Sequence, residues 1–167
     1  MSSSVLLCTH LAAASLALHP ADLPHAFART HSVGSVSRYR VEYARVNGAA
    51  GLQEGPLEID STAVVYAGPA AARAALRRAA PLHAAGLAVG YPLGDAAHEF
   101  VVQLGSALGA LLRYTIVWRE GRVDASVTVT GRVGVVSAAD LAPPARAQEA
   151  RIVRAATRAR RSCPPRS

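Results

Sequence analysis

The chain has 167 residues, the size of one ordinary domain, and needs neither disulfides nor metals to bury a core. Hydrophobic residues make up 51% of it but aromatic residues only 5%, so aliphatic side chains must supply most of the buried area. The net charge is +7, yet residues 141–167 hold seven arginines and one glutamate, whereas the rest holds 11 arginines and ten acidic residues. Because the body is nearly neutral, the composition argues against a dedicated nucleic-acid-binding domain.

An apolar stretch, Val5–Leu18, lies at the start of the chain. At about 1.5 Å per residue it is too short to cross a bilayer, but it has the length of the hydrophobic part of a signal peptide. No basic residue precedes it, and Leu7 stands before Cys8 where a lipoprotein signal has a small residue. Residues 1–18 are therefore either a degenerate export signal, or the first strand or an apolar N-terminal arm of a cytosolic domain. A disulfide between Cys8 and Cys163 would stabilise the fold by closing nearly the whole chain, but none is expected, because both segments have the composition of poorly ordered chain.

Two strands and a helix are predicted in the first half of the domain. Residues 32–37 are small and polar and indicate a loop. Residues 37–46 alternate apolar and polar side chains, the pattern of a half-buried strand. Residues 57–67 form a second strand, after which Pro69 begins an alanine-rich helix that ends at Ala80.

Three further strands are predicted at residues 97–104, 111–118 and 123–131. The last two are joined by a short turn in which Gly121 can adopt positive φ, so they form a hairpin. Strict alternation of valine or alanine with polar residues over 123–131 supports this pairing.

A C-terminal helix is predicted to end near Arg160. Ser137 and Asp140 have the spacing of a capping box, but Pro143 and Pro144 remove two backbone donors just after it. Either the helix kinks at the prolines, or a short turn precedes a helix that begins near Pro144. Residues 159–167 are expected to be a disordered basic tail.

Together these elements predict a single α+β domain over residues 19–158. We expect one antiparallel sheet of five or six strands with two main helices packed on one face. Residues 38–43 and 113–118 look alike, and each begins a β stretch that ends in a helix, so an internal ββα duplication is a further hypothesis.

Several short motifs, in a shared order over about residues 15 to 155, resemble uncharacterised secreted proteins and lipoproteins of actinobacterial type. They lie at residues 22–27, 65–66, 93–97, 118–123, 137–140 and 145–152. A similar order occurs in extracellular sensor domains of receptor Ser/Thr kinases. The resemblance implies an antiparallel sheet with packed helices and a location outside the cytoplasm, and the family has no established activity to carry over to this chain. The chain departs from the pattern at His25, after Asp95 and at Pro143-Pro144.

Four aromatic residues on the best strands are the candidate ligand-binding residues: Tyr39, Tyr43, Tyr114 and Trp118. They are expected either to line a cleft for a small apolar ligand or simply to pack in the core. A cleft between sheet and helix would bury a small or acyl ligand.

Four arginines recur at helical spacing near the C-terminus and are the candidate anion-contacting residues: Arg151, Arg154, Arg158 and Arg161. One basic helix face suits phosphate or an anionic surface, although such a face is also an ordinary solvated one. Asp95, in a turn, is expected to cap a backbone N–H. No metal-ligand spacing, phosphate loop, nucleotide fingerprint or serine-nucleophile motif is present, so no metal, cofactor or catalytic residue is predicted.

The favoured hypothesis is a non-catalytic ligand-binding or sensor-like domain outside the cytoplasm, secreted or membrane-anchored, with a small apolar ligand as its partner. Nucleic acid is not favoured as a partner, and a membrane would be contacted through residues 1–18 at most. One alternative is a cytoplasmic module that uses its arginine-rich helix on nucleic acid or anionic surfaces. Another is an unrecognised hydrolase, which would need converging His, Asp and Ser side chains. The sequence indicates neither the ligand nor the oligomeric state.

Overall fold

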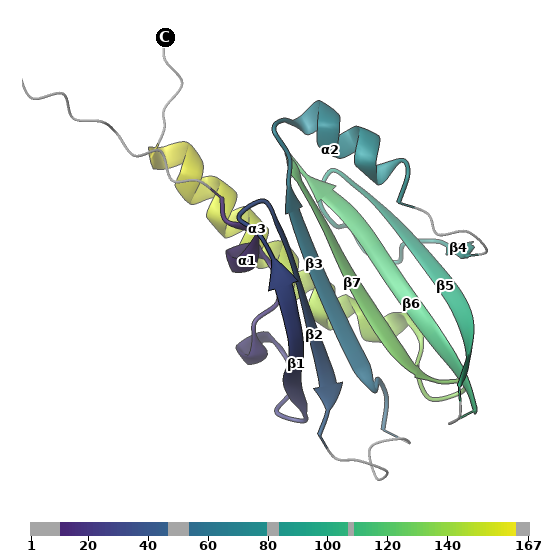
Figure 1. Ribbon diagram of the computed structural model, residues 1–167. Helices are drawn as coiled ribbons and strands as arrows, with labels where there is room; N and C mark the ends of the chain where they lie inside the picture. The colour runs from purple at the N-terminus through teal and green to yellow at the C-terminus, as the bar shows by residue number, and fades with distance from the viewer. Residues whose placement is uncertain (1–10, 47–53, 80–83, 107–108, 163–167) are drawn as a thin grey trace, which may run out of the picture.

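The computed structural model describes residues 11–46, 54–79, 84–106 and 109–162. In this part of the chain, seven antiparallel strands form one sheet in the order β1-β2-β3-β7-β6-β5-β4 (Figure 1). The strands are β1 (Phe27–Gly34), β2 (Arg38–Arg45), β3 (Glu58–Val65), β4 (Ala85–Leu87), β5 (Ala96–Ser106), β6 (Gly109–Glu120) and β7 (Val123–Arg132). The helices are α1 (Ala13–Leu16), α2 (Pro69–Leu76) and α3 (Ala142–Ser162). The predicted α+β class is confirmed, with more strands than the five or six expected.

The predicted hairpin of β6 and β7 is present, and Gly121 in its turn has a φ of 58°. Along β7 the odd-numbered residues from Val123 to Val129 are buried, whereas Asp124, Ser126 and Thr128 face the other side of the sheet. This alternation fixes the register, because a slip by one residue would turn every buried valine toward solvent.

Two strands were not predicted. β1 overlaps the expected loop at 32–37 and carries no apolar alternation, because all its residues except Phe27 are exposed. It is an edge strand held by its pairing with β2. β4 is three exposed residues paired with β5 at the other edge.

The C-terminal helix is longer than predicted. Ser137 and Asp140 do form a capping box, on a short 3₁₀ turn (η3, Ala138–Leu141) that runs directly into α3. Pro143 and Pro144 lie in the first turn of α3, where missing N–H groups leave no helical bond unmade. The helix continues to Ser162, so residues 159–162 are helical and are not a disordered tail.

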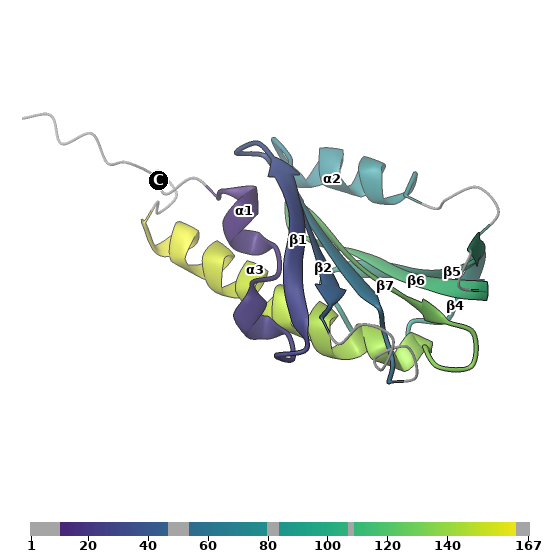
Figure 2. The same ribbon diagram turned by 60° about the horizontal axis from the view of Figure 1, so that its bottom comes forward.

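The core lies between the sheet and the layer that contains α1 and α3. Ile116, Trp118 and Val127 are fully buried on this face of the sheet, and Leu141 and Ile152 pack onto them from the helical side. Figure 2 shows α3 on one side of the sheet and α2 on the other, so the two main helices do not share a face. The short α2 packs against β6 and β7, and its buried residues are Ala72 and Leu76.

The described part of the N-terminal apolar segment is built into this core. Leu16 and Ala13 are 0% exposed, and Leu18 is 4% exposed. The backbone N–H of Ala13 donates to the carbonyl of Val36 at 2.8 Å, and that of Leu18 to the Ser61 hydroxyl at 3.0 Å. Residues 11–18 therefore form a short helix and an extended piece, and not the strand that was one of the predictions.

Candidate anion-binding groove

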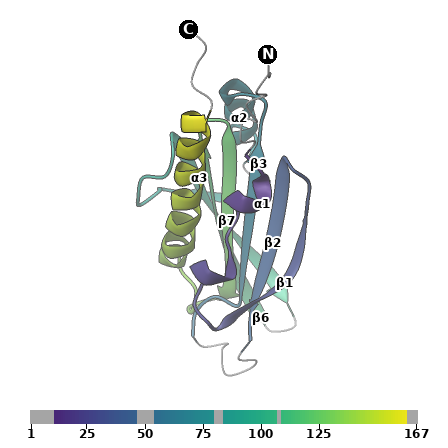
Figure 3. The same ribbon diagram turned by 90° about the vertical axis from the view of Figure 1, so that its left-hand side faces the viewer.

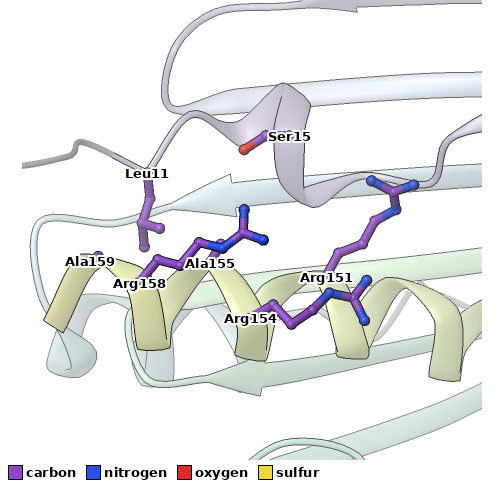
Figure 4. A pocket seen from close by; sticks show the side chains of 7 residues that line it. All are labelled: Leu11, Ser15, Arg151, Arg154, Ala155, Arg158 and Ala159. Atoms are coloured by element: carbon purple, nitrogen blue, oxygen red, sulfur yellow. The ribbon is translucent and has the colours of Figure 1, made fainter. Parts of the chain in front are cut away.

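A groove of about 410 Å³ runs between α1 and the C-terminal half of α3. Its lining comes from both helices and is shown in Figure 4: Leu11, Ser15, Arg151, Arg154, Ala155, Arg158 and Ala159. We call this the α1–α3 groove. It brings together three of the four arginines predicted to contact anions, whereas Arg161 is exposed and lies outside the lining.

The sequence places the arginines along the groove because α3 uses its other side for the core. Ala145, Gln148 and Ile152, at helical spacing, are 0%, 0% and 1% exposed. The residues that alternate with them are left to face α1 or solvent. The small side chains of Ala155 and Ala159 then leave room for the long arginines to lie across the groove.

Arg151 is already neutralised. Its Nε donates to Asp22 Oδ2 at 2.5 Å and its Nη2 to Asp22 Oδ1 at 3.1 Å, which makes a bidentate ion pair. The two side chains are 26% and 16% exposed, so this pair is better shielded from water than a surface pair. It ties α3 to the short turn η1 (Pro20–Asp22) that follows α1.

Arg154 and Arg158 differ from Arg151 because no described acidic side chain forms an ion pair with either. Both are exposed. In Figure 4, Arg158 extends from α3 toward α1, where Ser15 lies, and Arg151 reaches to the segment beyond α1. The groove therefore carries two uncompensated positive charges beside one neutral pair, an arrangement that attracts an anion.

The four predicted aromatic residues share one face of the sheet, but it is the core face. The strand register puts them in two rows that run across β2, β3, β7 and β6. One row is Tyr43, Ile59, Val129 and Tyr114, and the other is Tyr39, Ala63, Ala125 and Trp118. Tyr43 is 1% and Trp118 0% exposed, while Tyr39 and Tyr114 are partly buried against the same core. A ligand reaching Tyr43 or Trp118 would have to displace core side chains.

The polar ends of the two buried aromatics are hydrogen bonded inside the protein. The Tyr43 hydroxyl donates to the Leu18 carbonyl at 2.8 Å, and Trp118 Nε1 donates to Glu149 Oε2 at 2.5 Å. Burial raises the pKa of the Glu149 carboxyl, and its hydrogen bond from Trp118 opposes that rise. These contacts join α3 and the N-terminal segment to the sheet and have the character of structural bonds.

Asp95 caps a backbone N–H, as predicted: its Oδ2 accepts from Gly121 N at 3.0 Å and from Arg119 Nη1 at 2.5 Å. Gly94 precedes it with a φ of 50°, and a Cβ there would overlap the Arg119 carbonyl. Asp95 is thus tied to the β6–β7 turn.

The other wall of the groove was not predicted from the sequence. Leu11 and Ser15 lie about 140 residues before the arginines, inside a segment that resembles an export signal. Asp22, which neutralises Arg151, falls in a turn that the motif resemblance marked but to which it assigned no role.

The described residues were also compared with the patterns of a histidine or cysteine site, a metal site and a membrane span. His19, His25, His31 and His98 are exposed and do not line the groove, and His10, His83, Cys8 and Cys163 lie outside the described residues. Within those residues, no three His, Cys, Asp or Glu side chains gather as metal ligands would. None of the helices in the same ranges combines the length and apolar character that a membrane span requires.

Comparison with known protein families, with curated proteins and with solved structures gives no match for this chain.

Proposed function

We propose that this chain is a non-catalytic ligand-binding domain of the sensor-like kind, and that the α1–α3 groove holds an anionic group of its ligand. The observation that carries the proposal is the pairing pattern of the arginines. Arg151 is held by Asp22, whereas Arg154 and Arg158 line the same groove with no acidic partner among the described residues. A phosphate or carboxylate would accept charge-assisted hydrogen bonds from both guanidinium groups and offset their positive charge.

The groove replaces the aromatic cleft as the proposed site. It is open to solvent and bordered by Leu11 and Ser15, so an apolar part of a ligand would lie beside the anion site. The predicted apolar ligand thus becomes a ligand with at least one anionic group.

Location outside the cytoplasm remains part of the proposal and rests on the motif resemblance and on the apolar run Val5–Leu18. The core role of Ala13 and Leu16 limits how such a chain would be processed. An exported form that keeps this fold must retain the chain from about residue 13 onward, because cleavage beyond Leu16 would remove a fully buried leucine.

The test is a calorimetric titration of the full chain with inorganic pyrophosphate at low salt. We expect binding by the wild type, and a loss of at least about tenfold in affinity in the double variant R154Q/R158Q, because bonds to charged groups contribute about 1.5–3 kcal/mol each. Both residues are exposed, so the melting temperature should not change.

The matched control is R73Q/R77Q. These arginines have the same four-residue spacing, are exposed on and beside α2, and give the same change in charge. The control should bind like the wild type. Equal weakening in both variants would reduce the effect to net charge and refute the groove. Pyrophosphate should be recovered intact by phosphorus NMR, and its hydrolysis would overturn the non-catalytic proposal.

The competing hypothesis is that the arginine-rich helix α3 binds nucleic acid. Exposed Arg154, Arg158 and Arg161 would then form one continuous basic face. Retention of a single-stranded oligonucleotide that falls steeply with salt, and that is lost equally in R161Q, would favour that reading over a groove centred on α1.

A further inference from the structure

Three connections between elements meet at one end of the sheet. Val65 N, at the end of β3, donates to the carbonyl of Ser37 in the β1–β2 loop at 2.7 Å, and Tyr66 N donates to the carbonyl of Arg122 in the β6–β7 turn at 2.9 Å. Figure 3 shows that α2 and the C-terminal end of α3 lie at this same end of the molecule. Loops and helix ends from both faces of the sheet thus form one surface.

Five arginines belong to this surface, which we call the basic end: Arg38, Arg78, Arg122, Arg160 and Arg161. Arg122 and Arg160 line one small hollow between the β6–β7 turn and α3, and Arg161 follows in the last turn of α3. Burial raises the pKa of Tyr66, and the nearby charges of Arg38 and Arg78 oppose that rise. The elements that carry the five arginines are therefore neighbours.

The positive charge of the basic end is not balanced. No described acidic side chain forms an ion pair with any of its five arginines. Two acidic side chains lie near them: Glu120 lines the same hollow as Arg122, and the charge of Asp124 acts on Tyr66. All five arginines except the half-buried Arg122 are exposed, so an excess of positive charge faces solvent.

The spread of the arginines fits a flat anionic partner better than a small anion or a nucleic-acid strand. They come from β2, from the residues after α2, from the β6–β7 turn and from α3, and they do not converge on one point. Every tyrosine, phenylalanine and tryptophan in the described part of the chain is buried or half-buried, so none offers the exposed ring on which single-stranded nucleic acid stacks.

Apolar residues border the arginines. Val36, in the β1–β2 loop, is 71% exposed. Leu11, the first described residue, lines the hollow with Arg122 and Arg160, and residues 5–7 before it are Val-Leu-Leu in the sequence. Basic residues beside apolar ones are typical of surfaces that bind the interface of an anionic bilayer.

We propose that the basic end binds the surface of an anionic phospholipid bilayer, with its five arginines against the lipid headgroups. The sequence predicted a membrane contact through residues 1–18 at most, and the basic end extends this contact to the folded domain. Each arginine near such a surface raises the affinity about fivefold. Arg122 and Arg160 do not line the α1–α3 groove, so the proposal does not depend on the function assigned to that groove.

The test is sedimentation of the full chain with vesicles of phosphatidylcholine, alone or with about 30% phosphatidylserine, in about 0.1 M salt. We expect binding to the anionic vesicles only, and a bound fraction that falls as the salt concentration rises. The double variant R122Q/R160Q should weaken this binding by at least about tenfold. Its melting temperature should not change, because neither guanidinium group has a hydrogen bond or ion pair to a described residue.

The matched control is R29Q/R132Q, which makes the same change in charge near the opposite end of the strands. Arg29 lies early in β1, and Arg132 ends β7. This control should bind the anionic vesicles like the wild type. Equal weakening in the two double variants, or equal binding to neutral and anionic vesicles, would refute the role of the basic end.

Two further measurements separate this proposal from its competitors. A single-stranded oligonucleotide that binds more tightly than anionic vesicles, and is lost in R122Q/R160Q, would make nucleic acid the partner and overturn the proposal. R122Q/R160Q should still bind pyrophosphate like the wild type. Absence of vesicle binding by a wild type that binds pyrophosphate would overturn the basic end and leave the groove proposal standing.

Discussion

Gln148 should be among the most costly residues to truncate, because it is fully buried and joins α3 to the sheet through two hydrogen bonds. Its Oε1 accepts from the Ser61 hydroxyl at 2.9 Å, and its Nε2 donates to the Thr62 carbonyl at 2.9 Å. The Ser61 hydroxyl also accepts from Leu18 N at 3.0 Å, so the network includes the N-terminal segment. Gln148 and Ser61 are both 0% exposed, so water cannot replace a lost partner.

The change Gln148→Ala removes both bonds and leaves the Ser61 donor and the Thr62 carbonyl without that partner. A buried polar group without a partner costs about 1–3 kcal/mol, and the cavity adds to this. We expect the free energy of unfolding to fall by about 3–5 kcal/mol, and the melting temperature by about 6–20 °C at about 2–4 °C per kcal/mol. Urea unfolding followed by the fluorescence of Trp118, the only tryptophan and 0% exposed, measures this loss.

The matched control on the same helix is Arg154→Ala, an exposed position that should change stability by less than about 0.5 kcal/mol. A double-mutant cycle with Ser61→Ala should give a coupling energy of at least about 1 kcal/mol, because each residue loses its partner in the other variant. A loss below about 1 kcal/mol in Gln148→Ala, or strictly additive effects, would show that the buried network does not hold α3 to the sheet.

Two further predictions concern the N-terminal segment and pH. Leu16→Ala should lower the free energy of unfolding in urea by about 2–5 kcal/mol, because Leu16 is fully buried. The control Ser15→Ala changes an exposed neighbour and should lower it little. Equally small losses in both variants would show that this segment does not belong to the core. Burial raises the pKa of Asp124 from 3.8 to about 6, partly offset by Arg119, so the folded state holds this proton more tightly than the unfolded chain. Stability should therefore fall as pH rises from about 4 to about 6, and Asp124→Asn should flatten that fall when urea midpoints are compared at the two pH values; an unchanged slope would contradict it.

The central strands were predictable because their two faces differ. β2, β3 and β7 alternate buried and half-exposed residues, and that alternation is visible in the sequence as a period of two. β1 has no buried face beyond Phe27 and is held mainly by backbone pairing with β2, and backbone pairing leaves no mark on the side-chain pattern. Edge strands of this kind are invisible to periodicity.

The fate of the aromatic residues shows a different limit. The alternation of apolar and polar residues correctly predicts that Tyr43 and Trp118 lie on the apolar face of the sheet. Whether that face lines a cleft or forms the core depends on the elements that cover it. The covering elements are α3 and a four-residue helix whose apolar residues fit an export signal equally well. Only the α3 side of the groove could be predicted from the sequence, for the same reason. Spacing alone puts Arg154 and Arg158 near one another, whereas Ser15 joins them only through the tertiary fold.

The buried and exposed sides of α3 carry different residues, so binding and stability can be tested separately in this protein. Gln148 and Ile152 point into the core, and Arg154 and Arg158 follow on the exposed side, so charge changes in the groove leave the buried contacts untouched. Arg151 belongs to both sets, since it lines the groove and also forms the shielded pair with Asp22. A variant at Arg151 would lose an anion contact and expose the Asp22 charge at once, so weaker binding there could come from either cause. The pair Arg154 and Arg158 is free of that ambiguity, and it alone can decide whether the groove recognises an anion.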